Sequence, residues 1–327
     1  MNDGIEEREV FVLGFSDFAF LALIILLYTF QNFFCKKFSL TYTGNPDDTT
    51  PVFTTIGGLV VLLVTFLFAG CKFSAQPVTI ILGVLNAAAL YFYNDFLLKG
   101  SLCGPYSVLT VFAVFGGITL PAAVKWIGFQ EKMTGPAMCF VAVIMVAVYL
   151  MSCKPKDENT DAINKISPKF LLFCIGMFVC NGSYASILAM QQELSGEGEK
   201  EELIMITFGI SAAVSVVKLV LGGNRQKNPF KMTGKAVANL LIYALSAAFA
   251  INSLVIIMLL DINVGVLLAV QNAGVMLLSV VFSYVFFKEK LTKMNVVGSI
   301  VMAIGLVGIT VFERVEFSQI PEMFSKF

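Results

Sequence analysis

The sequence predicts an all-α polytopic membrane protein with about ten transmembrane helices in two inverted five-helix repeats. Three observations carry this prediction: the composition, the long apolar runs, and a charged motif that occurs twice. Hydrophobic residues make up 57% of the chain, charged residues 13%, and the mean hydropathy is +0.85. Since a soluble domain carries about 25% charged residues, this chain cannot cover itself with a solvated surface. The net charge of zero argues against a nucleic-acid partner.

The apolar runs define the expected helices, because about 18 or more apolar residues are typical of a membrane helix. The runs are 18–35, 49–71, 73–94, 100–124, 133–153, 170–192, 203–217, 236–260, 262–287 and 294–312. The short run at 203–217 can be lengthened if Lys218 reaches the membrane interface. The N-terminal MNDGIEEREV is acidic, unlike the start of a signal peptide, so we expect the first run to remain as a span.

A polar segment, KPKDENTDAINKISP at 154–168, divides the runs into two groups of five. We therefore predict a first five-helix repeat over residues 1–153, a connecting loop at 154–169, a second repeat over 170–312 and a tail at 313–327.

The same motif occurs near the end of each half. Residues 129–135 read FQEKMTG and residues 287–293 read FKEKLTK, and a shift of 158 positions superimposes them. This shift also places Asn94 on Asn252 and Gly116 on Gly274. With five spans in each copy, the second copy enters the membrane from the opposite side, as in the inverted repeats of transporters. We interpret Glu131 and Glu289 as structural corners of the two repeats, at helix starts.

The second copy resembles a known family. The stretch 269–312 has an aromatic and acidic turn followed by a glycine-bearing helix, with Glu289, Thr292, Gly298, Gly305 and Gly308. This pattern is similar to the drug/metabolite transporter superfamily, in its EamA-like permease branch. The first copy departs from it, since Phe140 stands where a glycine is expected.

The resemblance implies an exporter of small metabolites or drug-like solutes that works by alternating access. The sixth run, with CNGSYASILAMQQE, resembles a bacterial branch, which implies the bacterial cytoplasmic (inner) membrane. A homodimer is left open. The lysines and arginines concentrate in the odd-numbered loops, so the positive-inside rule places both termini outside, whereas the resemblance favours cytoplasmic termini.

Polar side chains inside the apolar runs are the candidate solute site, because such groups are costly in a membrane interior. The candidates are Gln31, Asn32, Asn86, Tyr91, Asn94, Asn181, Tyr184, Tyr243, Asn252, Gln271 and Asn272. Amides and phenols both donate and accept hydrogen bonds, which suits a neutral or zwitterionic solute. Amides also join membrane helices to one another, and the sequence leaves both interpretations open.

Asp95, directly after the run 73–94, is the one acid that we expect inside a span, about one helical turn from its end. A carboxylate at that depth is a candidate for proton coupling. The alternative is an interfacial acid satisfied by water or by Lys99.

Other classes of function fit the sequence less well. The chain contains no histidine and no C-x-x-C pair, so we expect no enzyme, no metal site and no cofactor. An exchanger of nucleotide-sugars or phosphometabolites needs Lys or Arg facing the cavity, and every basic residue except Lys218 falls in a loop or at a span end. A membrane scaffold or lipid-handling protein would not need polar residues on several spans. The expected partners are a small solute and the lipid bilayer.

Overall fold

The computed structural model describes residues 15–103, 106–130, 134–151, 167–195, 199–222, 228–258, 264–287 and 293–312. Within these ranges the chain forms ten α-helices, a short 3-10 helix (η1, Pro46–Asp48) and no strand. The helices are α1 (Phe15–Thr41), α2 (Thr49–Phe68), α3 (Pro77–Cys103), α4 (Tyr106–Phe129), α5 (Gly135–Met151), α6 (Pro168–Leu194), α7 (Lys200–Leu221), α8 (Gly234–Ile257), α9 (Val264–Phe287) and α10 (Lys293–Phe312).

Seven helices are long and apolar enough to cross a membrane, counted over the described residues: α1, α2, α3, α4, α6, α7 and α8. The other three contain shorter apolar stretches, Gly135–Ala147, Leu267–Ser279 and Val296–Gly305. Each predicted run has its centre on a different helix. The prediction of an all-α, multi-pass membrane protein is therefore confirmed, and the count of ten spans stays a prediction.

Local sequence determines where several helices begin and end. Ser167 caps α6 by accepting a hydrogen bond from the Phe170 N–H at 3.1 Å, and Thr233 caps α8 in the same way. Thr134 accepts from the Ala137 N–H at 3.4 Å at the start of α5. Gln130 follows α4 with φ of +55°, the left-handed conformation that commonly terminates a helix. The FQEKMTG motif thus contains a helix stop and a helix start.

Glu131 and Glu289 lie outside the described residues, as do Thr292 and most of the predicted connecting loop. Their role as repeat corners stays a prediction.

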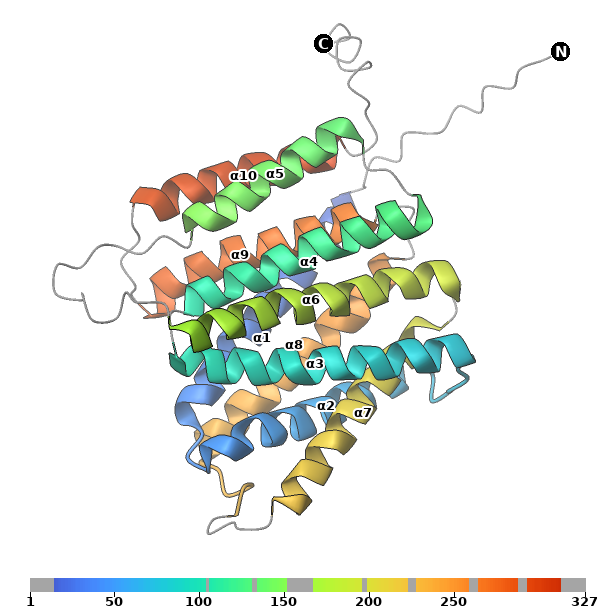
Figure 1. Cartoon of the computed structure of the whole chain (residues 1–327), viewed down its shortest axis with the longest axis vertical. Helices are drawn as coiled ribbons and strands as arrows, with labels where there is room; N and C mark the ends of the chain where they lie inside the picture. The colour runs from blue at the N-terminus through green and yellow to red at the C-terminus, as the bar shows by residue number, and fades with distance from the viewer. Residues whose placement is uncertain are drawn as a thin grey trace, which may run out of the picture.

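The helices pack in a regular order along the long axis of the molecule (Figure 1). The pair α5 and α10 lies at one end and the pair α2 and α7 near the other, and each pair is in contact. Between them, α4 packs on α6 and α9, and α3 packs on α6 and α7. If the repeat is present, each helix corresponds to the helix five places away in the chain. The contacts α3–α6, α3–α7 and α4–α6 then correspond to the pairs α8–α1, α8–α2 and α9–α1. All three resulting pairs are also in contact.

The α5–α10 pair is antiparallel. Phe140, near the start of α5, lies over Gly308 near the end of α10, and Ile144 lies over Gly305. Phe140 thus fills the space above a glycine of the partner helix. The starts of α5 and α10, each of which follows one copy of the charged motif, lie at opposite ends of this pair.

Close backbone approach joins α4 to α6. A Cβ atom on Gly116 would overlap the Phe178 carbonyl oxygen, and one on Gly182 would lie 2.7 Å from the Gly116 carbonyl oxygen. Small residues of this kind let membrane helices approach closely and gain van der Waals contact. The two helices are therefore held at the middle of the bundle.

Two charged residues lie deeper than expected. Helix α3 continues to Cys103, so Asp95 lies about two turns before its end rather than one. Lys125 is 3% exposed near the end of α4 and forms an ion pair with Glu193 of α6. The sequence places Lys125 at a span end, where a lysine is expected to reach water, and its acidic partner on another helix could not be predicted.

Candidate functional site

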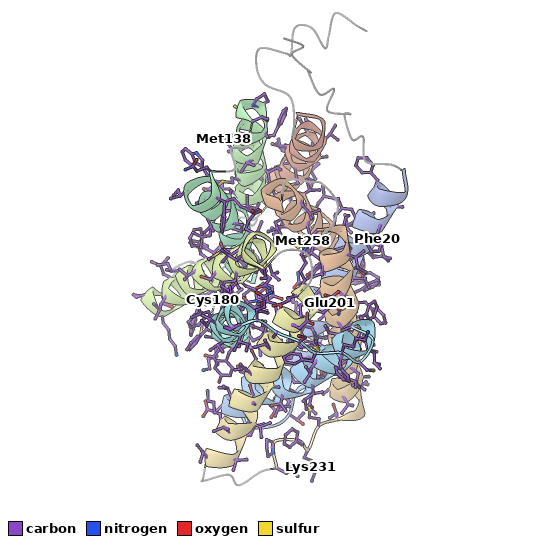
Figure 2. All side chains as sticks on the ribbon, turned by 90° about the vertical axis from the view of Figure 1, so that its right-hand side faces the viewer. Phe20, Met138, Cys180, Glu201, Lys231 and Met258 are labelled. Atoms are coloured by element: carbon purple, nitrogen blue, oxygen red, sulfur yellow. The ribbon has the colours of Figure 1, made fainter. Side chains whose placement is uncertain are left out.

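A central cavity of about 130 Å³ lies among α1, α3, α4, α6, α7, α8 and α9. Eight of the eleven predicted substrate-binding residues line it: Gln31, Asn32, Asn94, Asn181, Tyr184, Tyr243, Gln271 and Asn272. Figure 2 shows side-chain oxygen and nitrogen atoms in the interior of the bundle near Cys180, while carbon dominates the outer faces. The structure brings these residues together, and their binding of a solute stays a prediction.

Helical spacing explains how each helix presents its polar residues. On α1, Tyr28, Gln31 and Asn32 follow the i, i+3, i+4 pattern of a single face. On α6, Asn181 and Tyr184 share their face with Leu188. Each of these helices therefore contributes one stripe to the cavity wall.

Three polar lining residues were not predicted from the sequence: Tyr28, Tyr93 and Thr110. Tyr28 could have been found, because it lies one turn before Asn32. On α3 the predicted face contained Tyr91, Asn94 and Asp95, whereas the cavity is lined by Leu90, Tyr93 and Asn94. The predicted face is therefore rotated from the observed one by about one residue, or about 100° around the helix.

Three predicted residues lie away from the cavity. The Asn252 amide donates to the Thr65 hydroxyl at 2.9 Å and to the Ala248 carbonyl at 2.8 Å. Asn86 is only 1% exposed, on α3. The Tyr91 hydroxyl lies 3.0 Å from the Lys218 ammonium, which donates to it. For Asn252 in particular, the alternative interpretation of an amide that joins two helices fits the observed contacts.

Many polar atoms at the cavity lack a protein partner. Gln31 Oε1 is buried with no hydrogen-bond partner among the described residues. The amide nitrogens of Asn181 and Asn272 donate to the carbonyls of Ala113 and Leu268, at 2.7 and 2.8 Å, and their carbonyl oxygens bond to no described residue. The hydroxyls of Tyr28, Tyr93 and Tyr184 also make no hydrogen bond within the described part of the chain. Since unpaired buried polar groups are costly, the cavity is suited to a solute or water that pairs with them.

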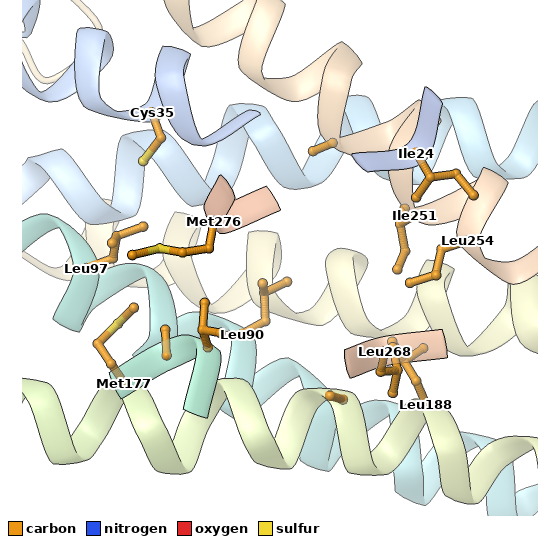
Figure 3. Packing of buried hydrophobic residues seen from close by; sticks show 14 of the residues in the cluster. Ile24, Cys35, Leu90, Leu97, Met177, Leu188, Ile251, Leu254, Leu268 and Met276 are labelled. Atoms are coloured by element: carbon orange, nitrogen blue, oxygen red, sulfur yellow. The ribbon is translucent and has the colours of Figure 1, made fainter. Parts of the chain in front are cut away.

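Apolar side chains line one part of the cavity. Figure 3 shows Leu188, Ile251, Leu254 and Leu268 grouped together with Ile24. The first four of these line the cavity and come from α6, α8 and α9. The wall is therefore polar in one part and apolar in another, as is common in sites for small molecules.

None of the cavity-lining residues is charged. Asp95, the proton-coupling candidate, lies outside the lining and forms an ion pair with Lys99 at 2.8 Å. Its carboxylate oxygen Oδ1 is buried with no hydrogen-bond partner among the described residues. The Lys99 contact is the one that the alternative interpretation of Asp95 expected.

A second polar cluster joins α3, α6 and α7 at their ends. The Thr79 hydroxyl donates to the Glu199 carboxylate and accepts from the Gln191 amide at 2.8 Å. The Gln76 N–H also donates to Glu199, at 3.0 Å. These hydrogen bonds, that of Thr79 first, lower the pKa of Glu199. Unlike the cavity, this cluster satisfies most of its polar groups internally.

Among the described residues, no group of three or more His, Cys, Asp or Glu side chains is placed to hold a metal ion.

Comparison with known proteins identifies the fold and no family. No protein-family model and no curated protein sequence matches the chain. The chain is similar to a crystal structure described only as that of a protein, with a TM-score of 0.65 and 14% sequence identity. The similarity covers 90% of this chain and 96% of the other. The arrangement of helices over nearly the whole chain is therefore one that occurs in a solved structure.

Proposed function

We propose that the protein is a secondary transporter that moves a small solute across a membrane by alternating access. The observation that carries the proposal is the central cavity, whose wall of amides and phenols lies inside an otherwise apolar bundle. Polar groups from α1, α3, α6 and α9 meet there, and several of their atoms have no hydrogen-bond partner among the described residues. A solute would satisfy these groups.

The proposal includes ten spans and two inverted repeats. The positions that line the cavity from α4 and α9 support this, because they correspond under the shift of 158 residues. Thr110, Ala113 and Val114 line it from α4, and Leu268, Gln271 and Asn272 line it from α9. The correspondence among helix contacts and the antiparallel α5–α10 pair support it independently. Two related halves can alternate between conformations that open the site to opposite sides.

The proposal extends to the EamA-like permeases of the drug/metabolite transporter superfamily, with export of a small metabolite or drug-like solute from a bacterial cell. The support is the glycine pattern of α10, where Gly305 and Gly308 receive side chains of α5. Glycine at these positions allows the last helix of each half to pack closely on the other.

An exchanger of nucleotide-sugars or phosphometabolites is the second candidate within the superfamily. Phosphate groups require Lys or Arg in the site, and the cavity-lining residues include neither. A membrane scaffold or lipid-handling protein is the candidate from another class, and it gives no reason for unpartnered polar groups at the centre. The cavity therefore favours transport of a solute without phosphate.

Reconstitution in liposomes tests the proposal. We expect at least one class among amino acids, sugars, nucleobases and organic cations to raise the unfolding temperature of the purified protein and to cross the membrane in its presence. Flux measured with and without a pH gradient shows whether protons are coupled to it. The absence of both stabilisation and flux with every class of solute would refute the proposed function.

A further inference from the structure

The cavity also restricts the chemistry of the solute, and this inference rests on the proposed function. Its volume of about 130 Å³ is close to that of an engineered cavity of about 150 Å³ that admits benzene. Drug-sized ligands occupy pockets of about 300–1,000 Å³. In this conformation the cavity therefore has room for a solute with about one aromatic ring.

The electrostatic character of the cavity excludes a net charge on the bound solute. A charge taken out of water needs an opposite charge or several hydrogen bonds to it, and no lining residue is ionised. Neither Lys125 nor Asp95 lines the cavity, and each forms an ion pair, with Glu193 and Lys99 respectively. A neutral solute avoids this desolvation cost.

The unpartnered groups determine the hydrogen bonds that the solute must make. The carbonyl oxygens of Asn181 and Asn272 are acceptors, and they require donors on the solute. The Gln271 amide and the hydroxyls of the lining tyrosines supply donors for its acceptors. A solute with adjacent N–H and C=O groups pairs with an amide side chain through two hydrogen bonds, as asparagine and glutamine do with adenine.

Four tyrosine rings complete the wall: Tyr28, Tyr93, Tyr184 and Tyr243. They come from α1, α3, α6 and α8, so aromatic surface faces the cavity from several directions. Planar heterocycles stack on aromatic side chains without needing a charge. Aromatic surface combined with amides distinguishes this cavity from one built for an aliphatic solute.

We propose that the site binds a neutral, planar solute of about one ring that carries an amide-type donor and acceptor. Pyrimidine bases and aromatic carboxamides have this chemistry. Their carboxylate analogues have the same ring and a negative charge, so they are the natural comparison.

The test uses two matched pairs of probes, nicotinamide with nicotinate and uracil with orotate, at pH 7. We expect a neutral member of at least one pair to raise the unfolding temperature of the purified protein and to exchange across liposomes. Its carboxylate partner should bind at least tenfold more weakly. Carboxylate binding that equals or exceeds neutral binding in both pairs, or no binding by either neutral probe, would overturn the inference.

Two variants connect the binding to the cavity. Gln31→Met and Asn32→Leu should each weaken binding of the neutral probe about tenfold or more, and either one is sufficient if the other does not fold. Asn239→Leu is the control, since this amide bonds to Thr41 away from the cavity, at 3.1 Å. Equal weakening in the control and the cavity variants would count against the assignment.

The outcomes separate this inference from the proposed function. Flux of an amino acid or a sugar with no binding of neutral rings would retain transport and overturn the solute class. Binding of neutral rings at the cavity without any flux would retain the solute class and overturn transport. Absence of both would overturn both.

Discussion

Helices α4 and α9 correspond under the shift of 158 residues, and they line the cavity with different kinds of side chain. At the three corresponding lining positions, α4 carries Thr110, Ala113 and Val114, while α9 carries Leu268, Gln271 and Asn272. At two of these positions α9 has the amides Gln271 and Asn272, where α4 has the small apolar residues Ala113 and Val114. One glycine is kept in both helices, Gly116 on α4 and Gly274 on α9.

The difference separates what the fold requires from what the site requires. The shared glycines lie where each helix crosses its neighbour, α6 for α4 and α1 for α9. The lining positions next to them are free to differ, because they face the cavity rather than a packed helix. The polar wall thus differs between α4 and α9, although each of the two helices has a glycine at its contact with a neighbouring helix.

The largest expected effect comes from the shared glycines. Gly116→Ala should lower the free energy of unfolding by about 3 kcal/mol, because its Cβ overlaps a backbone carbonyl oxygen that cannot move without separating α4 from α6. Gly274→Ala should cost about 1 kcal/mol, since its Cβ would meet the Ile25 side chain, whose Cδ1 lies 2.6 Å away and can rotate. Thermal unfolding in detergent measures both.

Equal destabilisation by the two substitutions would mean that the two crossings are equally tight, and the comparison would fail. Gly128→Ala is a suitable control, because nothing lies within 4 Å of the added methyl group.

The second effect concerns the amides that distinguish α9. Gln271→Ala and Asn272→Val install the residues that α4 carries at the corresponding positions. Each should weaken solute binding about tenfold, equivalent to about 1.4 kcal/mol. Gln271→Ala should change stability little, because the Gln271 side chain has no hydrogen-bond partner among the described residues, whereas Asn272→Val also removes the hydrogen bond to the Leu268 carbonyl at 2.8 Å. Ligand-dependent thermal shifts give the affinity.

Gln191→Met provides the opposite case. This buried amide donates to Thr79 outside the cavity, so its loss should reduce stability by about 1 kcal/mol and leave solute binding unchanged. If Gln191→Met weakened binding as much as Gln271→Ala, the distinction between amides that bind a solute and amides that join helices would not hold.

The sequence predicts much of this arrangement because the signals are local. Long apolar runs locate the helices, and polar residues within them locate most of the cavity. The choice between Tyr91 and Tyr93 was not predictable, because α3 carries polar residues on two faces and only its neighbours decide which face is inside. The same is true of Lys125, whose position depends on Glu193 from a helix 68 residues away in sequence. Side-chain direction depends on helix pairing, which the sequence pattern does not give.

Asp95 provides a third comparison, since the corresponding residue of the second half is Ser253. Because Asp95 lies outside the cavity lining and is paired with Lys99, Asp95→Asn should change stability by about 1 kcal/mol or less and leave solute flux unchanged. Flux in liposomes with an imposed pH gradient tests this. Loss of the response to the gradient, with binding intact, would instead assign proton coupling to Asp95.

The smallest effect comes from the acids that precede the second helix of each half, Asp48 before α2 and Glu199 before α7. Asp48 is buried, whereas Glu199 is partly exposed and accepts hydrogen bonds from Thr79 and Gln76 that lower its pKa. Since the pKa is lower in the folded protein, the stabilisation is present above the pKa of the unfolded chain, about 4.3. It is lost as the pH falls through the folded-state pKa.

Glu199→Gln should therefore be less stable than the wild type at neutral pH, and the difference should vanish in strong acid, as followed by thermal unfolding in detergent across this range. Glu202→Gln removes the same charge from the first turn of α7, where Glu202 makes no hydrogen bond to a described residue, and it controls for the effect of the helix dipole. A stability difference for Glu199→Gln that does not depend on pH would show that the carboxylate contributes packing rather than charge. The acid before α7 would then be no different in kind from the buried acid before α2.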